Sequence, residues 1–438
     1  MKRREFFKYS AAMGASALLP GRALVGAERE AGVRMGEMLL PESPDFKTKH
    51  LIVVIYGNGA RKKDVVDNPE YAPHQTSLIK EGTLFTEDYG DTANLHGYMY
   101  TEVLTGIDPP TQRPLFPTWN EYVRKKTGGK ASDFWMLQGA SYYRGWTFDV
   151  KHFSRHPDYG ISSGTTSLTM NKLFYEENKA SPREIFDLLI EKGLGHSAQE
   201  RKEIEEWIAD VMARRSYIPP STKEPLIDRE LQYGDAQCFT MVPQILKAFK
   251  PRVITVQLLA LDDAHADFGY WDYNTEYWEY IKHVKATDEL IGKMWAEVQA
   301  DPYLRDTTAL VLRPECGRDD EVNIYGQLGH SPGNYYAHYV WTMAIGPDFK
   351  KGQVVTEKVQ RRDLAPTITY LMSGQSAEHS VGHVRTQMFH DEHRLPSYVL
   401  PFTAEAAEPA FDGEGAREER RRAEMFRRFA RSTVGYGD

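Results

Sequence analysis

Residues 253–271, VITVQLLALDDAHADFGYW, constrain the fold of this chain more than any other stretch. The stretch opens with an almost continuous apolar run over 253–261, which predicts a strand covered on both faces, as in a parallel sheet between helices. Asp262, Asp263 and His265 follow at once. They would lie beyond the carboxyl end of the strand, where open α/β sheets bind ligands. The alternative is that an aspartate caps the turn and that His265 packs against Trp271.

Further short apolar runs alternate with segments of helical periodicity along the chain. Such alternation over 438 residues, 41% of them hydrophobic, predicts a three-layer α/β/α sandwich with a central, mostly parallel sheet. The predicted strands cover 50–56, 82–89, 134–137, 307–312 and 339–345, and the predicted helices cover 94–106, 116–126, 182–192, 198–215, 239–249, 277–298 and 364–371.

Composition divides the chain into four parts, and the first of them is the segment 1–27. We expect an α/β domain over 50–400, and within it an insertion at about 140–235 that is aromatic and glycine-rich at first and helical later. Residues 28–49 are polar and mixed, as in a linker or arm, whereas 401–438 hold dense charge runs typical of a solvated helix or tail.

The first 27 residues resemble an export signal. A basic start, KRREFFK, is followed by a short segment of small apolar residues and by a cleavage-like Val25-Gly26-Ala27. Paired arginines before x-Phe-Phe-Lys resemble the twin-arginine signal, which carries folded proteins out of the bacterial cytoplasm. The segment is too short for a committed transmembrane helix. We therefore expect a periplasmic or otherwise extracytoplasmic protein that contacts the membrane only if its signal stays uncleaved; an accidental basic tip is the alternative.

Charge and cysteine content exclude two further classes. A net charge of -8 and a pI near 6.0 give no reason to expect nucleic acid as a partner. Two cysteines, Cys238 and Cys316, are too few for a disulfide framework in so long a chain, and whether they pair stays open.

Polar residues follow four of the predicted strands, and their types are those of hydrolytic metal sites. Carboxylate, imidazole and thiolate all bind zinc, and a two-metal centre needs ligands that converge from several strand ends. The loops hold Asn58 in the first, Asp262, Asp263 and His265 in the second, Glu315 and Cys316 in the third, and His330 in the fourth.

The order and spacing of these motifs resemble the alkaline phosphatase superfamily of phosphatases, phosphodiesterases and sulfatases. The resemblance spans residues 50–372 and includes the helix start RDLAPT near the end of that range. Its other motifs are HLIVVIYGNGAR, NLHGYMYTEVLTG, ALDDAHADFGYW, TALVLRPECGRD and the Gly-His at 329–330.

Carried over residue by residue, the resemblance implies one metal subsite that is intact and one that is altered. Asp262, His265 and His330 match three family ligands, with Asp263 as a rival for the first position. The altered subsite would have Asn58, Glu315 and Cys316 as its ligands, and His96 takes the position of the nucleophile. The resemblance thus implies a divalent metal, zinc in particular. One metal site fits these residues better than two sites do.

Two functions remain open. The first is a metal-dependent hydrolase of small-molecule phosphate or sulfate esters, with His96 beside the bond that is cleaved. The second is a non-catalytic protein that binds no metal and serves as a periplasmic binding or assembly subunit with a protein partner. Each altered residue also has a structural explanation: Asn58 as a turn residue, His96 as a buried histidine and Cys316 as a small buried side chain.

Overall fold

The computed structural model describes residues 45–57, 59–90, 95–109, 112, 114–139, 158–165, 196–213, 226–262, 279–323, 328–331 and 333–390. These residues lie in one compact unit that begins at Asp45. Among them, no helix is both long and apolar enough to cross a membrane. The domain boundaries expected at 27, 49 and 400 fall outside the described residues or between elements, and they stay predictions.

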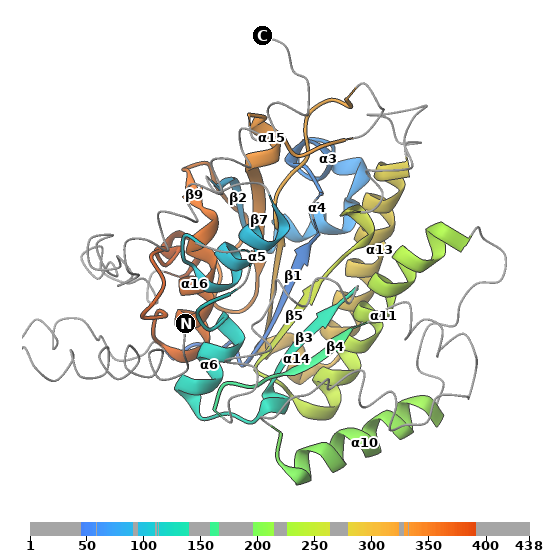
Figure 1. Cartoon of the computed structure of the whole chain (residues 1–438), viewed down its shortest axis with the longest axis vertical. Helices are drawn as coiled ribbons and strands as arrows, with labels where there is room; N and C mark the ends of the chain where they lie inside the picture. Colours follow the sequence, from blue (N-terminus) through green and yellow to red (C-terminus); the bar gives the residue numbers. More distant parts are fainter. Residues whose placement is uncertain are drawn as a thin grey trace, which may run out of the picture. The chain divides into compact units, whose positions relative to one another are not determined.

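A nine-stranded sheet forms the middle layer, in the order β4-β3-β5-β1-β6-β7-β2-β8 with β9 beside β2 (Figure 1). Strands β1, β3, β4, β5 and β6 pair in parallel, whereas β7 runs antiparallel to both β6 and β2. The predicted mostly parallel sheet is therefore confirmed. The bounds are β1 His50–Tyr56, β2 Gly82–Tyr89, β3 Phe134–Gln138, β4 Ser162–Thr165, β5 Val253–Gln257, β6 Thr308–Pro314, β7 Tyr339–Ile345, β8 Gln353–Val355 and β9 Val359–Gln360.

Strand β1 shows why the sheet needs two covering layers. All seven of its residues are buried. Successive side chains of a strand point to opposite faces, so Ile52, Val54 and Tyr56 join one hydrophobic core while Leu51 and Val53 join the other. A run that is apolar on both faces can be buried only when helices cover both sides.

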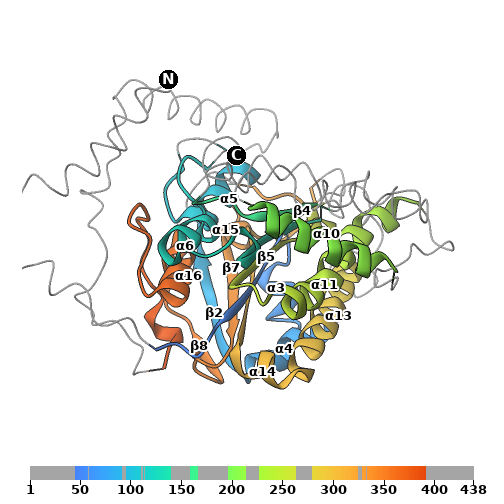
Figure 2. The same cartoon turned by 90° about the horizontal axis from the view of Figure 1, so that it is seen from below.

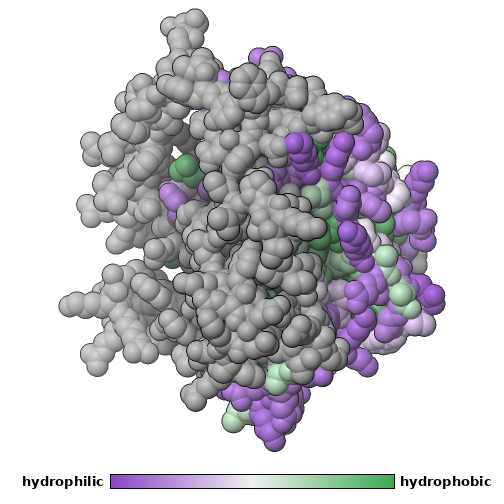
Figure 3. All heavy atoms as spheres, turned by 90° about the vertical axis from the view of Figure 1, so that its right-hand side faces the viewer, coloured by the Kyte–Doolittle hydropathy of each residue, from purple (hydrophilic) through white to green (hydrophobic). Residues whose placement is uncertain are grey.

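Helices cover the two faces as the sequence predicts (Figure 2). One core contains side chains of α11 (Leu226–Phe249) and α13 (Glu279–Ala300), with α4 (Pro73–Ile79) against it. The other core contains side chains of α5 (His96–Thr105), α6 (Trp119–Thr127) and α16 (Leu364–Ser373). Shorter or outer helices are α3 (Lys62–Val65), α10 (Ala198–Ala213), α14 (Pro302–Thr307) and α15 (Tyr335–His338), and the described surface on the α11 side is mostly hydrophilic (Figure 3).

Local signals set several element ends. Helix α5 stops at Gly106, which has the left-handed φ of 72° that glycine adopts without strain. Helix α6 begins later than predicted, because Thr118 and Glu121 form a capping box and Pro117 stays outside. Helix α11 begins at Leu226, well before the predicted start at 239. The helix predicted over 182–192 lies outside the described residues.

The strand predicted over 253–261 is shorter than expected. Strand β5 ends at Gln257, and residues 260–262 are already helical. The buried carboxylate of Asp235, on α11, accepts the backbone N–H groups of Leu259 at 2.8 Å and Ala260 at 2.9 Å. These donors bond a side chain instead of a neighbouring strand, so the chain turns there and carries Asp262 over the edge of the sheet.

Candidate functional site

Parallel pairing brings the ends of three strands together. Strand β1 lies between β5 and β6, with Ile55 opposite Gln257 and Tyr56 opposite Pro314. Residues that follow β5 and β6 therefore emerge on either side of the loop after β1. The first residue of α5, His96, reaches the same place. Of the predicted site residues, the structure gathers His96, Asp262 and Glu315.

The imidazole of His96 lies between two carboxylates. Its Nδ1 is 2.6 Å from Oε1 of Glu315, and its Nε2 is 3.4 Å from Oδ2 of Asp262. Burial and the helix N-terminus both disfavour a positive ring at this position. Burial lowers the pKa of His96 most, but the carboxylates of Glu315 and Asp262 together raise it above its usual value. A carboxylate lies at each ring nitrogen, so both nitrogens are directed at protein oxygens and neither is directed at a metal or a phosphorus atom.

A second cation holds the other side of Asp262. The guanidinium of Arg318 donates from Nη2 to Oδ1 of Asp262 at 2.9 Å and to its backbone carbonyl at 3.1 Å, and from Nη1 to Leu328 O at 3.3 Å. Arg318 is fully buried. We call His96, Asp262, Glu315 and Arg318 the ion-paired centre; its two cations balance its two carboxylates.

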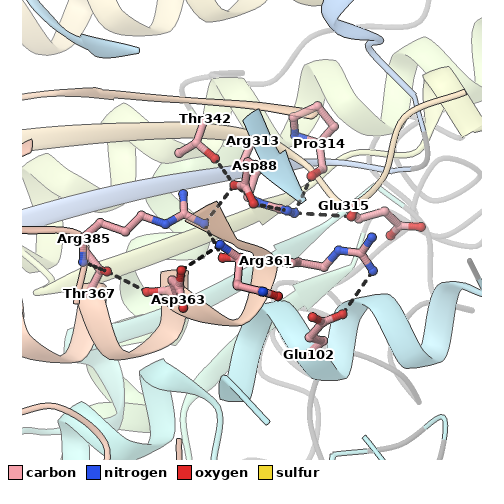
Figure 4. Close-up of polar contacts among 11 residues, drawn as sticks. Asp88, Glu102, Arg313, Pro314, Glu315, Thr342, Arg361, Asp363, Thr367 and Arg385 are labelled. Atoms are coloured by element: carbon pink, nitrogen blue, oxygen red, sulfur yellow. Dashed lines mark hydrogen bonds and ion pairs between the residues drawn. The ribbon is translucent and has the colours of Figure 1, made fainter. Parts of the chain in front are cut away.

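An arginine side chain of strand β6 holds the backbone at Glu315 in place. Arg313, two residues earlier, pairs with Asp88 of β2 through Nε at 2.9 Å and Nη2 at 3.1 Å (Figure 4). Its Nη1 also donates to the carbonyls of Pro314 at 2.5 Å and Glu315 at 3.3 Å. The turn that presents Glu315 is therefore held by a buried side chain as well as by the sheet. Burial raises the pKa of Glu315, against the opposing influence of His96.

Helix α5 is anchored in a similar way. Glu102, in the middle of the helix, pairs with Nη1 of Arg361 at 3.2 Å, and both side chains are fully buried. A Cβ on Gly90 would lie 2.0 Å from Nη2 of Arg361, so only glycine leaves room for this guanidinium. The contact fixes the helix whose first residue is His96.

Several residues that hold the centre in place were not predicted from the sequence: Asp88, Asp235, Arg313, Arg318 and Arg361. Only Arg313 carried a usable signal, because an arginine inside the buried run TALVLRP requires a buried anion. The sequence does not show which acid supplies that charge.

Of the remaining predicted site residues, the structure describes His330 and Cys316 but not Asn58, Asp263 and His265. His330 lies beside His96, with 5.9 Å between ring centroids. Cys316 is fully buried, its Sγ donates to Gly317 O at 3.2 Å, and burial raises the pKa of its thiol well above the usual range. Asn58, Asp263 and His265 lie outside the described residues, so their expected roles stay predictions.

The described donor set does not fit a metal ion. Within the described ranges, no group of three or more His, Cys, Asp or Glu side chains could hold one. Three of the four oxygens of Asp262 and Glu315 already face protein cations: Oδ1 of Asp262 bonds Arg318, and Oδ2 of Asp262 and Oε1 of Glu315 face His96.

Comparison with known proteins finds similarity in structure alone. No family model matches the chain, and no curated protein matches it. The sulfatase PsFucS1 from Pseudoalteromonas sp. is 14% identical, with a TM-score of 0.50 over 79% of this chain and 73% of that one. A phosphonate monoester hydrolase from Silicibacter pomeroyi is 14% identical, with a TM-score of 0.46 over 80% and 78% of the two chains. A protein in the alkaline phosphatase superfamily from Vibrio parahaemolyticus is 13% identical, with a TM-score of 0.46 over 91% of each chain. The chain therefore has the alkaline phosphatase-like α/β fold that its sequence predicts.

Proposed function

We propose that this chain is a non-catalytic protein on an alkaline phosphatase-like fold, acting as a periplasmic binding or assembly subunit. The observation that carries the proposal is the double pairing of His96 with Glu315 and Asp262. Attack on phosphorus or sulfur needs an unprotonated nitrogen directed at that atom, and both nitrogens of His96 are directed at carboxylates instead.

The charge balance of the ion-paired centre supports the same conclusion. Hydrolysis of an anionic ester needs positive charge that is free to stabilise the transferring group. Here Arg318 is bonded to Asp262, and His96 lies between Asp262 and Glu315. No net positive charge is left over from these four groups for a substrate.

Metal content and turnover test this proposal together. Purified full-length chain should contain no stoichiometric zinc, and it should not turn over aryl phosphate, phosphate diester, sulfate or phosphonate substrates above the background. Added zinc should leave its melting temperature unchanged, since ligands that bind the native state raise it. A zinc-dependent rise that disappears in Asp262→Asn would contradict the proposal.

A metal-dependent hydrolase of phosphate or sulfate esters with an altered site is the second candidate. It is favoured by the place of His330, because both His330 and Asp262 lie beside His96. His330 and Asp262 are two of the three expected zinc ligands, and His265 is the third. Turnover that requires zinc and that falls in both His330→Ala and Asp262→Ala would establish this candidate. Turnover that survives both changes would point to a contaminating enzyme.

Export by the twin-arginine route is a further part of the proposal. It rests on Arg3 and Arg4 and the segment that follows them, outside the described residues. Changing both arginines to lysine should retain the protein in the cytoplasm of a bacterial host, while the unchanged chain reaches the periplasm. Mass spectrometry of the exported chain would show whether it begins after Ala27 or keeps the whole segment.

A further inference from the structure

Four tyrosines, one exposed and three half-buried, form a row at the sheet edge that also carries the ion-paired centre. Tyr89 ends β2, Tyr339 begins β7, and Tyr335 and Tyr336 lie between them on α15, near α3 (Figure 1). The rings of Tyr335 and Tyr339 stack with centroids 4.5 Å apart and planes 17° apart, and the rings of Tyr89 and Tyr339 are 4.7 Å apart. We call these four residues the tyrosine rim.

The outermost ring is fixed although it faces water. Tyr335 is 44% exposed, yet its hydroxyl donates to Oε2 of Glu87 at 2.7 Å and lies 3.3 Å from Nζ of Lys62. Lys62 in turn pairs with Oε1 of Glu87 at 2.7 Å. Holding an exposed side chain in one conformation costs entropy, and a ring held in this way needs no further ordering to bind a flat ligand.

Two ammonium groups flank the rim. Nζ of Lys358 lies 3.6 Å from the ring centroid of Tyr89 and 5.3 Å from that of Tyr339, and Nζ of Lys62 lies 5.5 Å from that of Tyr335. Lys358 is exposed, and no carboxylate pairs with it among the described residues. Tyr89 and Tyr339 are covered by their neighbours in the row and by Lys358, so the rim offers the exposed ring of Tyr335 beside one unneutralised cation.

The rim is continuous with the ion-paired centre. The backbone N–H of Gly317 donates to Ala337 O at 3.0 Å, and a Cβ on Gly317 would lie 1.8 Å from Tyr336 O. The backbone of α15 thus packs directly on the residue after Cys316, two residues beyond Glu315. A ligand on the rim would extend along the edge of the sheet toward the centre.

We propose that the tyrosine rim binds a saccharide that carries anionic groups. The apolar faces of sugar rings pack on aromatic faces, and a sulfate or carboxylate substituent would pair with Lys358. The net charge of -8 repels a long polyanion such as nucleic acid. Charge attraction alone therefore cannot account for binding, and contacts with the aromatic rings must contribute much of the affinity. This inference goes beyond the proposed function, because it concerns a surface outside the ion-paired centre and holds whether or not the centre catalyses a reaction.

Calorimetry on the purified full-length chain tests the inference with defined probes. A sulfated chondroitin hexasaccharide should bind saturably, whereas neutral cellohexaose and a short polyphosphate of matched charge should each bind at least tenfold more weakly. Tyr335→Ala should weaken binding of the hexasaccharide about tenfold, since one stacked ring contributes on the order of 1.4 kcal/mol. Tyr335→Phe keeps the ring and should stay within about threefold of wild type. Lys358→Ala should weaken binding several-fold and reduce its salt dependence.

A matched control lies at the opposite edge of the sheet. Tyr303 is 47% exposed, and Nζ of Lys250 lies 5.2 Å from its ring centroid, so Tyr303→Ala removes a similar tyrosine beside a similar lysine. This change should leave binding of the hexasaccharide unaltered. The inference is overturned if the hexasaccharide does not bind, if Tyr335→Ala binds as wild type does, or if polyphosphate binds equally well. Binding of cellohexaose as tight as that of the sulfated hexasaccharide would overturn the anionic part.

Discussion

Two buried charge networks meet at the end of β6, and they differ in whether their cations can release a proton. The first, which we call the arginine cluster, surrounds Asp88 with Arg313, Arg385 and Thr342 (Figure 4). Its charged side chains are at most 2% exposed, and guanidinium groups do not lose a proton in proteins. The ion-paired centre instead contains His96, whose side chain is 21% exposed and titratable. The charges of the arginine cluster are fixed, whereas the charge of the centre changes when His96 gains or loses a proton.

The difference indicates separate roles. A buried carboxylate that accepts four bonds from two arginines and a threonine can stabilise only one arrangement of β2, β6 and β7. A centre that reaches solvent and can change protonation responds to what approaches it. We therefore expect substitutions in the arginine cluster to affect folding and substitutions in the centre to affect stability much less.

The largest effect is expected from Asp88→Ala. The change leaves Arg313 and Arg385 buried without their anion, and breaking a buried pair in this way costs about 3–5 kcal/mol. Urea unfolding at pH 7.5 measures the loss, and Asp88→Asn provides a milder variant in case the alanine form does not fold. As a control, Glu81→Ala breaks the exposed pair with Lys351 and should cost less than about 1 kcal/mol. A loss that small for Asp88→Ala would remove the distinction between the two networks.

The next largest effect is a loss of stability at low pH, and the group responsible lies outside both networks. Burial opposes the charge of Asp88, but Arg313 and Arg385 hold its pKa well below the usual range. A carboxylate with a lowered pKa stabilises the fold at every pH above about 3.8, so Asp88 cannot explain a loss at higher pH. Burial lowers the pKa of His379, which stacks on Phe116, from 6.5 to about 4.

The folded chain then binds the His379 proton less tightly than the unfolded chain does. The contribution of His379 is complete above pH 6.5 and is lost as the pH falls toward 4, by about 3 kcal/mol, since one pKa unit is worth about 1.4 kcal/mol. Unfolding free energies at pH 7.5 and 4.5 should differ much less in His379→Phe than in wild type. A shallow slope should remain, because burial also lowers the pKa of His50. An unchanged slope in His379→Phe would assign the acid loss to other groups.

The parts of this molecule that depend on neighbours along the chain were predictable from the sequence. The apolar run of β1 and the glycine that ends α5 are local signals, and both elements form where they were expected. The position of the centre was also predictable, because the parallel strands β5 and β6 must end at the same edge of the sheet.

The pairing of side chains was not predictable from the sequence. Asp88 and Arg385 are separated by 297 positions, and nothing near either residue indicates the other. The centre shows the same limit: His96, Glu315 and Asp262 suit metal chemistry by residue type, yet their distances describe ion pairs. Residue types indicate what chemistry is possible, whereas the distances between atoms decide which of the possible interactions forms.

The smallest effect is expected from Glu315→Gln. Removing this carboxylate leaves His96 beside Asp262, and the imidazole can release its proton, which no arginine can do. We expect a loss of about 1 kcal/mol at pH 7.5, several times less than for Asp88→Ala. His96→Ala and the double variant complete a cycle whose coupling energy should be about 0.5–2 kcal/mol, because the two side chains are in direct contact. If Glu315→Gln costs as much as Asp88→Ala, His96 does not release its proton, and the centre is as fixed as the arginine cluster. If the coupling energy is zero, the pair at 2.6 Å does not stabilise the folded state, and the proposal of an ion-paired centre loses its main support.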